Sequence, residues 1–343
     1  MVSFTSDNAS GAAPEILQAL AEVNAGAAMP YGQDAVTKRV EARLAEVFET
    51  KAAVFPVATG TAANALSLSL MAPPYGAIYC HEAAHIHVDE CGAPEFYSGG
   101  AKLVPLSGDH GKIDARTLGA AIDGAGNVHA VQPAAVSVTQ ATEAGTVYAP
   151  AEIAALAEVA RAHGLGLHMD GARFANALVA GNHSPAELTW KSGVDALSFG
   201  ATKNGALGAE AVVLFKPELA ATFAYRRKRG GHLISKMRFL SAQLEAYLHD
   251  DLWLRNARHA NAMAGRLAAG LQGIAGVSLC HPVEANEIFA RMPDAMIAGL
   301  LADGFAFYHW GGAAGREVRL VTSFDTDPKD VDAFLASASR SAA

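Results

Sequence analysis

Two polar residues, Asp170 and Lys203, follow short apolar runs, and their side chains could do chemistry together. The run Gly164–Met169 ends at Asp170, and the run Asp195–Phe199 leads through Gly-Ala-Thr to Lys203. If both runs are parallel strands, both side chains lie at the carboxyl edge of the sheet, where open α/β sheets bind ligands. Small and apolar residues flank the lysine, and burial there would lower its pKa and favour the neutral amine that a Schiff base requires.

Thr59-Gly60-Thr61 is a candidate phosphate site, because it follows an apolar run and precedes a helical pattern. The free N–H groups of a helix start attract phosphate, and glycine lets the backbone approach it. A phosphate site, a strand-end carboxylate that keeps a pyridine nitrogen protonated and a desolvated lysine are together what pyridoxal phosphate (PLP) requires. Taken singly, the turn also suits an ordinary strand-to-helix connection, and Asp170 also suits a helix N-cap.

The chain resembles the low-specificity L-threonine aldolases, which belong to the β-eliminating lyase group of fold-type I PLP-dependent enzymes. The stretches that carry the resemblance extend over nearly the whole chain: Ser6-Asp-Asn8, Tyr31-Gly32, Thr59-Gly-Thr-Ala-Ala-Asn64, Ala84-His85, His168-Met-Asp-Gly-Ala-Arg-Phe174, Ser198-Phe-Gly-Ala-Thr-Lys-Asn-Gly205 and Arg319-Leu-Val-Thr322. The resemblance implies a fold-type I, transferase-like α/β architecture. It consists of a large domain with a mostly parallel central sheet and a smaller C-terminal α+β domain.

The resemblance also implies which residues hold the cofactor. Lys203 would bind PLP covalently, and Asp170 would pair with the pyridine nitrogen. Arg173 would sit beside the phenolic oxygen of the ring and reach the substrate. Gly60 and Thr61 would hold the phosphate.

Other residues are expected, by the same resemblance, to act on the substrate or on protons. His85 would stack on the cofactor ring and help to move protons, and Asp89, one helical turn further on, would orient it. Arg319 would bind the substrate carboxylate, a role that suits a bidentate guanidinium. Ser6 and Tyr31 would approach the substrate.

One stretch departs from the family pattern. Many members carry a Glu-Asn-Thr-His-like stretch after the central strand, whereas this chain reads Ser137-Val-Thr-Gln-Ala-Thr-Glu143. If the second active-site histidine of the family belongs there, Thr142 or Glu143 stands in its place. The sequence therefore leaves open which group takes the proton of the β-hydroxyl.

Two further motifs have alternative interpretations. His81-Glu82-Ala-Ala-His85 matches the HExxH pattern of zinc proteases, which also needs a helix that carries the motif and a third ligand. The basic segment Arg226–Arg229, followed by Lys236, suits a solvated face or a nucleic-acid patch. The resemblance instead implies that this segment crosses a dimer interface and lends Lys228, with Lys236 as a further candidate, to the phosphate of the neighbouring subunit.

Alternating strand and helix patterns predict parallel α/β architecture, and this alternation ends after Arg229. Strands are expected at Ala53–Val57, Ala77–Cys80, Lys102–Leu106, His129–Thr139, Gly166–Met169, Ala196–Phe199, Glu210–Phe215, Val277–Leu279, Glu287–Ala290, Ala306–His309 and Val318–Val321. Helices are expected at Ala62–Met71, Ala151–His163, Ser235–Leu271 with a break near Asp250, Asp294–Asp303 and Pro328–Ser339. We expect an arm over residues 1–14, a large PLP-binding domain over 15–245 and a small domain over 246–343, with a connecting helix.

Composition limits the classes of partner. The 343 residues are 51% hydrophobic and carry a net charge of −8, which disfavours nucleic acid and anionic lipid as main partners. The uncharged run Ala52–Cys80 is long enough to cross a bilayer but holds three prolines, so a buried strand, turn and helix fit it better. Three scattered cysteines and an N-terminus without a signal-peptide pattern favour a cytoplasmic protein.

The leading hypothesis is an aldolase that cleaves L-threonine, L-allo-threonine and related β-hydroxy-α-amino acids to glycine and an aldehyde. The alternatives are a phenylserine aldolase, a PLP-dependent β-eliminating lyase or racemase, and a PLP-binding protein without turnover. No metal is assigned, and the resemblance implies a homo-oligomer, dimer or tetramer, with shared active sites.

Overall fold

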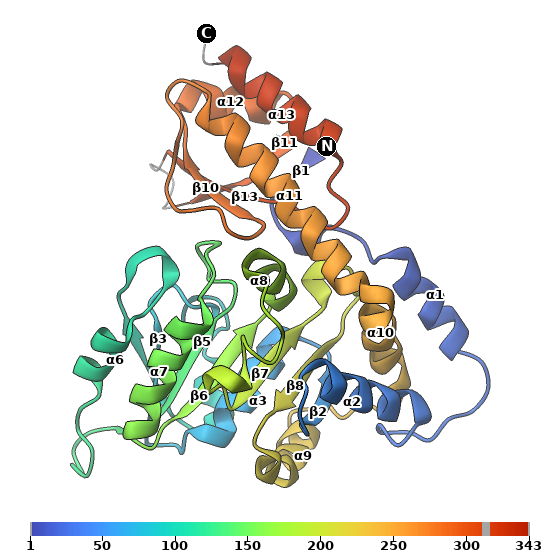
Figure 1. The fold of residues 1–343 in the computed structure, drawn as a ribbon, viewed down its shortest axis with the longest axis vertical. Helices are drawn as coiled ribbons and strands as arrows, with labels where there is room; N and C mark the ends of the chain where they lie inside the picture. The colour runs from blue at the N-terminus through green and yellow to red at the C-terminus, as the bar shows by residue number, and fades with distance from the viewer. Residues whose placement is uncertain (1, 311–315, 342–343) are drawn as a thin grey trace.

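A seven-stranded, mostly parallel sheet forms the centre of the larger body of the protein (Figure 1). The computed structural model describes residues 2–310 and 316–341. The strand order is β2-β8-β7-β6-β5-β3-β4, and only β8 runs against its neighbours among these strands. The strands are β2 (Ala53–Val57), β3 (Gly76–His81), β4 (Lys102–Leu106), β5 (Gln132–Thr139), β6 (Gly166–Gly171), β7 (Ala196–Gly200) and β8 (Glu210–Leu214). The predicted fold class is confirmed.

Helices cover this sheet, and their ends follow ordinary capping chemistry. Thr59 begins α3 by accepting a hydrogen bond from the backbone N–H of Ala62 at 3.2 Å. Pro150 occupies the first position of α7, where its missing N–H costs no hydrogen bond. The helices are α1 (Pro14–Val23), α2 (Ala35–Val47), α3 (Gly60–Met71), α4 (His85–Val88), α5 (Ala93–Ser98), α6 (Ala115–Ala121), α7 (Pro150–Ala162), α8 (Phe174–Gly181), α9 (Ala220–Arg229), α10 (Arg238–Leu248) and α11 (Leu252–Gln272). Short 3₁₀ turns are η1 (Asp7–Ala9), η2 (Asp109–Gly111), η3 (Trp190–Ser192), η4 (Thr202–Asn204), η5 (Pro217–Leu219) and η6 (His249–Asp251).

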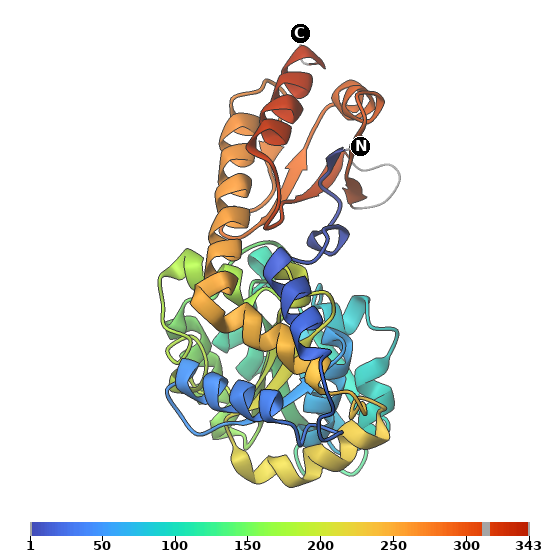
Figure 2. The ribbon, with the colours of Figure 1, turned by 90° about the vertical axis from the view of Figure 1, so that its right-hand side faces the viewer.

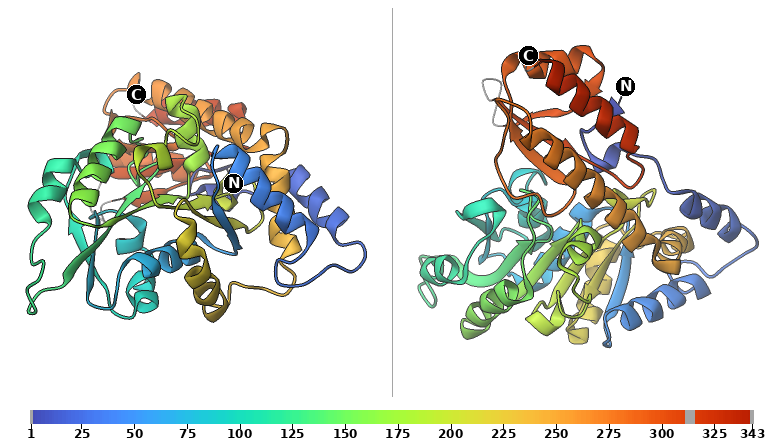
Figure 3. Two further views of the ribbon diagram at one scale, coloured as in Figure 1. Left: turned by 60° about the horizontal axis from the view of Figure 1, so that its bottom comes forward. Right: turned by 45° about the horizontal axis from the view of Figure 1, so that its top comes forward.

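A smaller body follows, built on an antiparallel sheet of order β12-β13-β10-β9. Its elements are β9 (Ser278–Leu279), β10 (Glu287–Arg291), α12 (Asp294–Ala302), β11 (Phe305–Ala306), β12 (Tyr308–Trp310), β13 (Glu317–Val321) and α13 (Pro328–Ser341). The first strand of the chain, β1 (Val2–Ser3), pairs in parallel with β11, so the N-terminal segment belongs to this body (Figure 3).

The long helix α11 joins the two bodies (Figure 2). Trp253 and Ala257, near its start, are buried in the core of the larger body. Leu267 and Leu271, near its end, are buried in a second core together with Phe4 and Phe334. The first part of α11 therefore packs in the core of the larger body and its last part in the core of the smaller body. The division into an arm, a large domain and a small domain at the predicted boundaries stays a prediction.

Most predicted elements are confirmed to within two residues of their ends, including the break near Asp250, where Asp250 and Asp251 adopt left-handed backbone angles. Two predictions were wrong in part. The strand expected at His129–Thr139 starts only at Gln132, because Asn127–Ala130 form a turn. The single strand expected at Ala306–His309 is two strands, β11 and β12, because one pairs with β1 and the other with β13.

None of the helices in the described part of the chain combines the length and apolar character needed to cross a membrane. The uncharged run Ala52–Cys80 forms β2, α3 and β3, as predicted.

Candidate active site

Two adjoining cavities lie where β6 and β7 end. The Gly60 cavity, of 240 Å³, is lined by Asn8, Ala58, Thr59, Gly60, Thr61, Asn64, His85, Glu90, Glu143, Asp170, Ala172, Thr202, Lys203 and Glu210. The Arg319 cavity, of 610 Å³, is lined by Ser6, Asn8, Ala83, His85, Val88, Asp89, Glu143, Arg173, Lys203, Tyr308, Trp310 and Arg319. The two cavities share Asn8, His85, Glu143 and Lys203. The structure thus brings together all predicted site residues except Tyr31 and Lys228.

The start of α3 offers unused hydrogen-bond donors to the Gly60 cavity. The backbone N–H groups of Gly60 and Thr61 have no acceptor among the described residues. A Cβ built on Gly60 would meet no atom within 4 Å, so space lies open above the backbone. Free N–H groups at the positive end of a helix are suited to an anion such as a phosphate.

Asp170 lies at the end of β6 and is 4% exposed. One of its oxygens accepts a hydrogen bond from the Nδ2 of Asn64 at 2.8 Å, and the other accepts from the backbone N–H of Ala172 at 3.0 Å. These two bonds fix the orientation of the carboxylate at the wall of the Gly60 cavity. It can pair there with a cationic ring nitrogen.

Lys203 lies in η4, immediately after β7, and lines both cavities. The neighbouring Asn204 anchors the turn: its Nδ2 donates to the hydroxyl of Tyr247 at 2.7 Å and to the backbone carbonyl of Trp253 at 2.8 Å. Gly205, which follows, has a φ of 110°, a backbone angle that residues other than glycine rarely adopt. The turn is therefore held rigidly while the lysine side chain projects into the site.

Glu210, the first residue of β8, is buried beside this turn and accepts a hydrogen bond from the backbone N–H of Ala201 at 2.8 Å. Burial raises the pKa of Glu210 to about 7, although the nearby Lys203 opposes this shift.

Four charged side chains form a network that crosses the two bodies. Arg173 donates from Nε and from one terminal nitrogen to Asp7, at 2.7 and 3.0 Å, and its other terminal nitrogen lies 3.1 Å from Glu287. Arg319 donates to the same Glu287 from Nε at 3.1 Å and from a terminal nitrogen at 2.5 Å. The guanidinium of Arg319 also lies against the ring of Trp310, 5.5 Å from its centre.

The network counteracts the effect of burial on the charges of two of its members, Asp7 and Arg173. Burial opposes the charge of Asp7, but Arg173, Lys203 and the hydrogen bond from Asn286 together hold the pKa of Asp7 below its ordinary value. Burial likewise opposes the charge of Arg173, and Asp7 and Glu287 raise its pKa instead. Sequence reasoning missed Asp7 and Glu287 as site residues. The signal for Asp7 was its place inside Ser6-Asp-Asn8, whereas Glu287 only opens a predicted strand.

His85 was expected to be oriented by Asp89, and the structure gives it a closer partner. Its Nδ1 lies 2.9 Å from Glu90, whose side chain is fully buried, while Nε2 lies 3.7 Å from Asp89, which is 79% exposed. Glu90 also accepts from the Nδ2 of Asn64 at 2.8 Å, so a chain of hydrogen bonds links His85 through Glu90 and Asn64 to Asp170. Glu90 was not among the predicted site residues.

The hydrogen bond to Glu90 raises the pKa of His85, against the effect of burial. We expect Glu90→Gln to return this pKa toward its ordinary value, as measured by NMR titration of the His85 ring. Because the folded-state pKa is raised, the bond stabilises the protein fully below the unfolded-state pKa, and this stability is lost as pH rises through the folded-state pKa. Glu90→Gln should remove that part of the pH dependence of unfolding. An unchanged His85 titration would contradict this assignment.

Tyr31 and Lys228 lie together but outside both cavities. The Nζ of Lys228 is 4.9 Å from the centre of the Tyr31 ring. The single chain therefore does not bring these two predicted residues to the site formed by Asp170 and Lys203.

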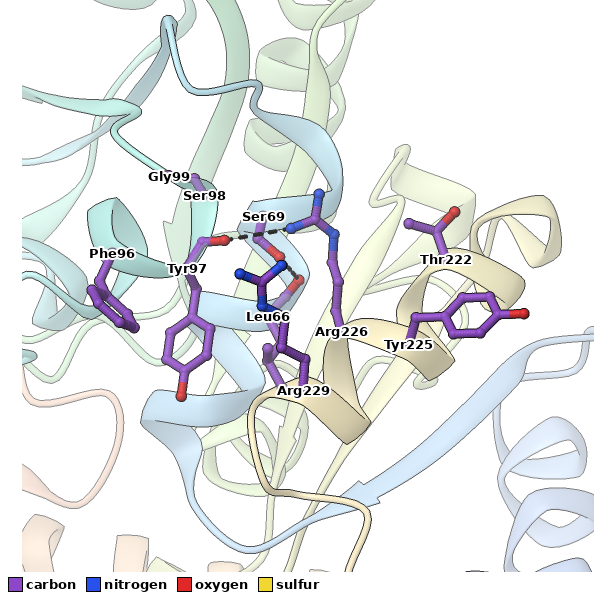
Figure 4. A pocket seen from close by; sticks show the side chains of 10 residues that line it. All are labelled: Leu66, Ser69, Phe96, Tyr97, Ser98, Gly99, Thr222, Tyr225, Arg226 and Arg229. Atoms are coloured by element: carbon purple, nitrogen blue, oxygen red, sulfur yellow. Dashed lines mark hydrogen bonds between the residues drawn. The ribbon is translucent and has the colours of Figure 1, made fainter.

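The basic segment Arg226–Arg229 forms the last turn of α9 and is not a uniformly solvated face. Arg227 is buried, lies 5.0 Å from the centre of the Phe55 ring and has its pKa lowered to about 10 by burial. Arg226 and Arg229 line a separate cavity of 640 Å³ (Figure 4). The other residues that line it are Leu66, Ser69, Phe96, Tyr97, Ser98, Gly99, Thr222 and Tyr225.

The HExxH motif does not have the helical geometry of a zinc protease. His81 ends β3, where its Nε2 lies 3.0 Å from the carbonyl of Gly108, and His85 begins α4. No group of three or more potential metal ligands occurs among residues 2–310 and 316–341. Because the two histidines are not on one helix, the structure contradicts the requirement of the zinc interpretation.

Comparison with known proteins assigns the family. Residues 3–295 match the family described as Beta-eliminating lyase. A low-specificity L-threonine aldolase from Pseudomonas aeruginosa is 45% identical over 324 residues, which cover 94% of this chain and 93% of that protein. A yeast protein of the same name is 26% identical over 82% of this chain and 73% of that protein.

Solved structures agree with the family. A threonine aldolase from Leishmania major superposes with a TM-score of 0.94 at 30% identity, over 100% of both chains. An aspartate aminotransferase from Thermus thermophilus, at 18% identity, has a TM-score of 0.74 over 99% of this chain and 91% of that one, and it supports the fold alone. The chain belongs to the beta-eliminating lyase family, in which its similar relatives are low-specificity L-threonine aldolases.

Proposed function

We propose that this protein is a PLP-dependent aldolase that cleaves L-threonine, L-allo-threonine and related β-hydroxy-α-amino acids to glycine and an aldehyde. The observation that carries the proposal is the arrangement of Gly60, Asp170 and Lys203 around one cavity. The names of the relatives support the reaction, since they are low-specificity L-threonine aldolases and a threonine aldolase. When bound, PLP would supply an electron sink for the bond that breaks.

The residues present fit this cofactor. The free N–H groups of Gly60 and Thr61 suit its phosphate, and the fixed carboxylate of Asp170 suits its pyridine nitrogen. The amine of Lys203 projects from a rigid turn into the same cavity, where a covalent link is possible. Arg173 lines the adjoining Arg319 cavity. Some of its N–H groups already bind Asp7 and Glu287, and the others would face the cofactor and the substrate.

The substrate would be held in the Arg319 cavity. Arg319 would bind its carboxylate, with Ser6 at the same cavity wall. His85, at the boundary of the two cavities, would stack on the cofactor ring. Tyr308 and Trp310 also line this cavity, and their aromatic rings suit a substrate that carries a phenyl group. We therefore include phenylserine as a second substrate.

The test is a product assay on the resolved isomers of threonine and phenylserine. We expect glycine with acetaldehyde or benzaldehyde, in protein that shows the visible absorbance of lysine-bound PLP. Ammonia with a keto acid would identify a β-eliminating lyase, and inverted amino acid would identify a racemase. Absorbance with no product from any isomer would identify a PLP-binding protein without turnover.

Arg319→Gln should raise KM for the amino acid by about 10- to 100-fold, because a charge-assisted hydrogen bond is worth about 1.5–3 kcal/mol. Steady-state kinetics on threonine measures this effect. The matched control is Arg316→Gln, an exposed arginine paired with Asp294, which should leave KM unchanged. A KM for Arg319→Gln equal to that of the unmodified protein would refute the role of Arg319.

We also propose that the protein is a cytoplasmic homo-oligomer whose subunits share active sites. The position of Lys228 and Tyr31 outside the cavities of their own chain supports the sharing, since both would then serve a neighbouring subunit. The cysteines Cys80, Cys91 and Cys280 are free, which suits a reducing compartment. Analytical ultracentrifugation of the full chain would measure the assembly.

A further inference from the structure

The loop after β5 holds both residues that could replace the second histidine of the family. Thr142 is fully buried, and its hydroxyl is used inside the loop: it donates to the carbonyl of His110 at 3.2 Å and lies 2.8 Å from the hydroxyl of Thr146. It also accepts from the backbone N–H groups of Ala144 and Thr146. Thr142 therefore maintains the shape of the loop and lines neither cavity of the site.

Glu143, the next residue, has the opposite orientation. It lines both the Gly60 cavity and the Arg319 cavity, as do Lys203 and His85. A side chain at this boundary lies between the groups that would hold the cofactor and the arginine that would hold the substrate carboxylate. The β-hydroxyl of an amino acid held by Lys203 and Arg319 would lie in the same region.

Glu143 is also the carboxylate of the site that the protein leaves uncommitted. The six others have partners: Asp7 with Arg173, Asp89 with His85 at 3.7 Å, Glu90 with His85, Asp170 with Asn64, Glu210 with Ala201 and Glu287 with Arg319. Among the residues described, the carboxylate of Glu143 has no hydrogen bond and no ion pair, and only burial and nearby charges act on it. It is free to accept a proton from a ligand.

The electrostatic surroundings suit a base. Burial raises the pKa of Glu143, the nearby charge of Glu287 raises it further, and Lys203 and Arg173 oppose these effects. A carboxylate of raised pKa accepts a proton more readily than an ordinary one does. His85, by contrast, already has a partner, because its Nδ1 lies 2.9 Å from the carboxylate of Glu90.

We propose that Glu143 is the catalytic base that takes the proton of the substrate β-hydroxyl. This inference rests on the proposed aldolase function. The proton passes from the hydroxyl oxygen to a carboxylate oxygen of Glu143, and the O–H electron pair becomes the second bond of the aldehyde carbonyl. The Cα–Cβ pair stays with the glycine half, for which PLP, when bound, would supply the electron sink. Glycine then gains a proton at Cα, and Glu143 returns its own proton to solvent.

Glu143→Gln separates this step from the rest of the reaction. We expect cleavage of threonine and phenylserine to fall by about 10²- to 10⁴-fold, the range for loss of a general base. Exchange of the α-proton of glycine with deuterated water should stay within a few-fold of the unmodified protein, since it involves no β-hydroxyl. In the unmodified protein kcat/KM should fall as pH drops through the pKa of Glu143, and Glu143→Gln should lack this limb.

A second readout does not depend on turnover. Infrared difference titration of the cofactor-free chain, unmodified minus Glu143→Gln, should show one carboxyl that titrates above the ordinary glutamate range. The matched control is Glu218→Gln, at an exposed glutamate in η5. It should change neither the rate of cleavage nor the rate of glycine α-proton exchange. Glu143→Asp, which keeps the carboxylate, should retain part of the cleavage activity and gives the same comparison if Glu143→Gln is unstable.

The outcomes are distinguishable. Normal cleavage by Glu143→Gln would overturn the proposal. Equal loss of cleavage and of glycine exchange would overturn it too, because Glu143 would then serve the structure of the site. Failure of the unmodified protein to form glycine from any β-hydroxy amino acid would instead refute the aldolase function itself.

Discussion

Lys203→Ala is expected to lower glycine formation from threonine by on the order of 10⁴-fold or more, the scale typical of removing a covalent nucleophile. The protein should also lose the visible absorbance of lysine-bound PLP. The reason is positional: Lys203 projects from η4 into both cavities, and the anchored Asn204 beside it leaves the turn little freedom to bring another amine there.

The control for Lys203 is Lys216→Ala. Lys216 pairs with Asp195 at 2.8 Å near the opposite end of β7, is 49% exposed and should leave activity unchanged. Added methylamine should restore part of the activity of Lys203→Ala, since a free amine can occupy the vacated space. Near-normal threonine cleavage by Lys203→Ala without an added amine would refute the proposed mechanism.

Asp170→Asn should lower kcat by about 10³-fold. The attraction between a carboxylate and a cationic ring nitrogen about 4 Å apart is about 4 kcal/mol at an effective dielectric constant of 20. If that attraction is lost in the transition state, the rate falls by about a factor of ten for each 1.36 kcal/mol. An asparagine oxygen can still accept the bond from Ala172, so the unfolding midpoint should change far less than the rate.

Asp195→Asn is the matched control for Asp170. Asp195 accepts from the backbone N–H of Leu167 at 2.9 Å, between the starts of β6 and β7, far from the strand ends that carry the site. Its substitution should leave kcat unchanged. If Asp170→Asn cleaves threonine at the rate of the unmodified protein, Asp170 does not hold the ring nitrogen.

The parts of the site that follow from strand ends could be predicted from the sequence. Asp170 and Lys203 end apolar runs, and parallel strands bring such ends to one edge of a sheet. Thr59 was recognisable as the start of α3 because a strand pattern changes there into a helical one. These are local signals, which remain readable without knowledge of the tertiary contacts.

The partners of these residues could not be predicted, because they depend on contacts between distant segments. Asp7 meets Arg173, and Glu287 meets both Arg173 and Arg319, only when the two bodies are assembled. The resemblance implied that Asp89 orients His85, and helical spacing agreed with it because Asp89 lies four positions further on. In the structure α4 ends at Val88, so Asp89 lies outside the helix and helical spacing does not determine the partner of His85.

The pairing of β1 with β11 limits when the newly synthesised chain can finish folding. Val2 and Ser3 pair with Phe305 and Ala306, Phe4 lies in the core of the smaller body, and Asp7 neutralises Arg173. Segments this far apart in sequence meet late in folding, since closing so long a loop costs entropy before any contact repays it. During synthesis Val2 and Ser3 cannot pair in this way until β11 has left the ribosome. Until then Arg173 lacks Asp7, one of its two carboxylate partners, and the site is incomplete.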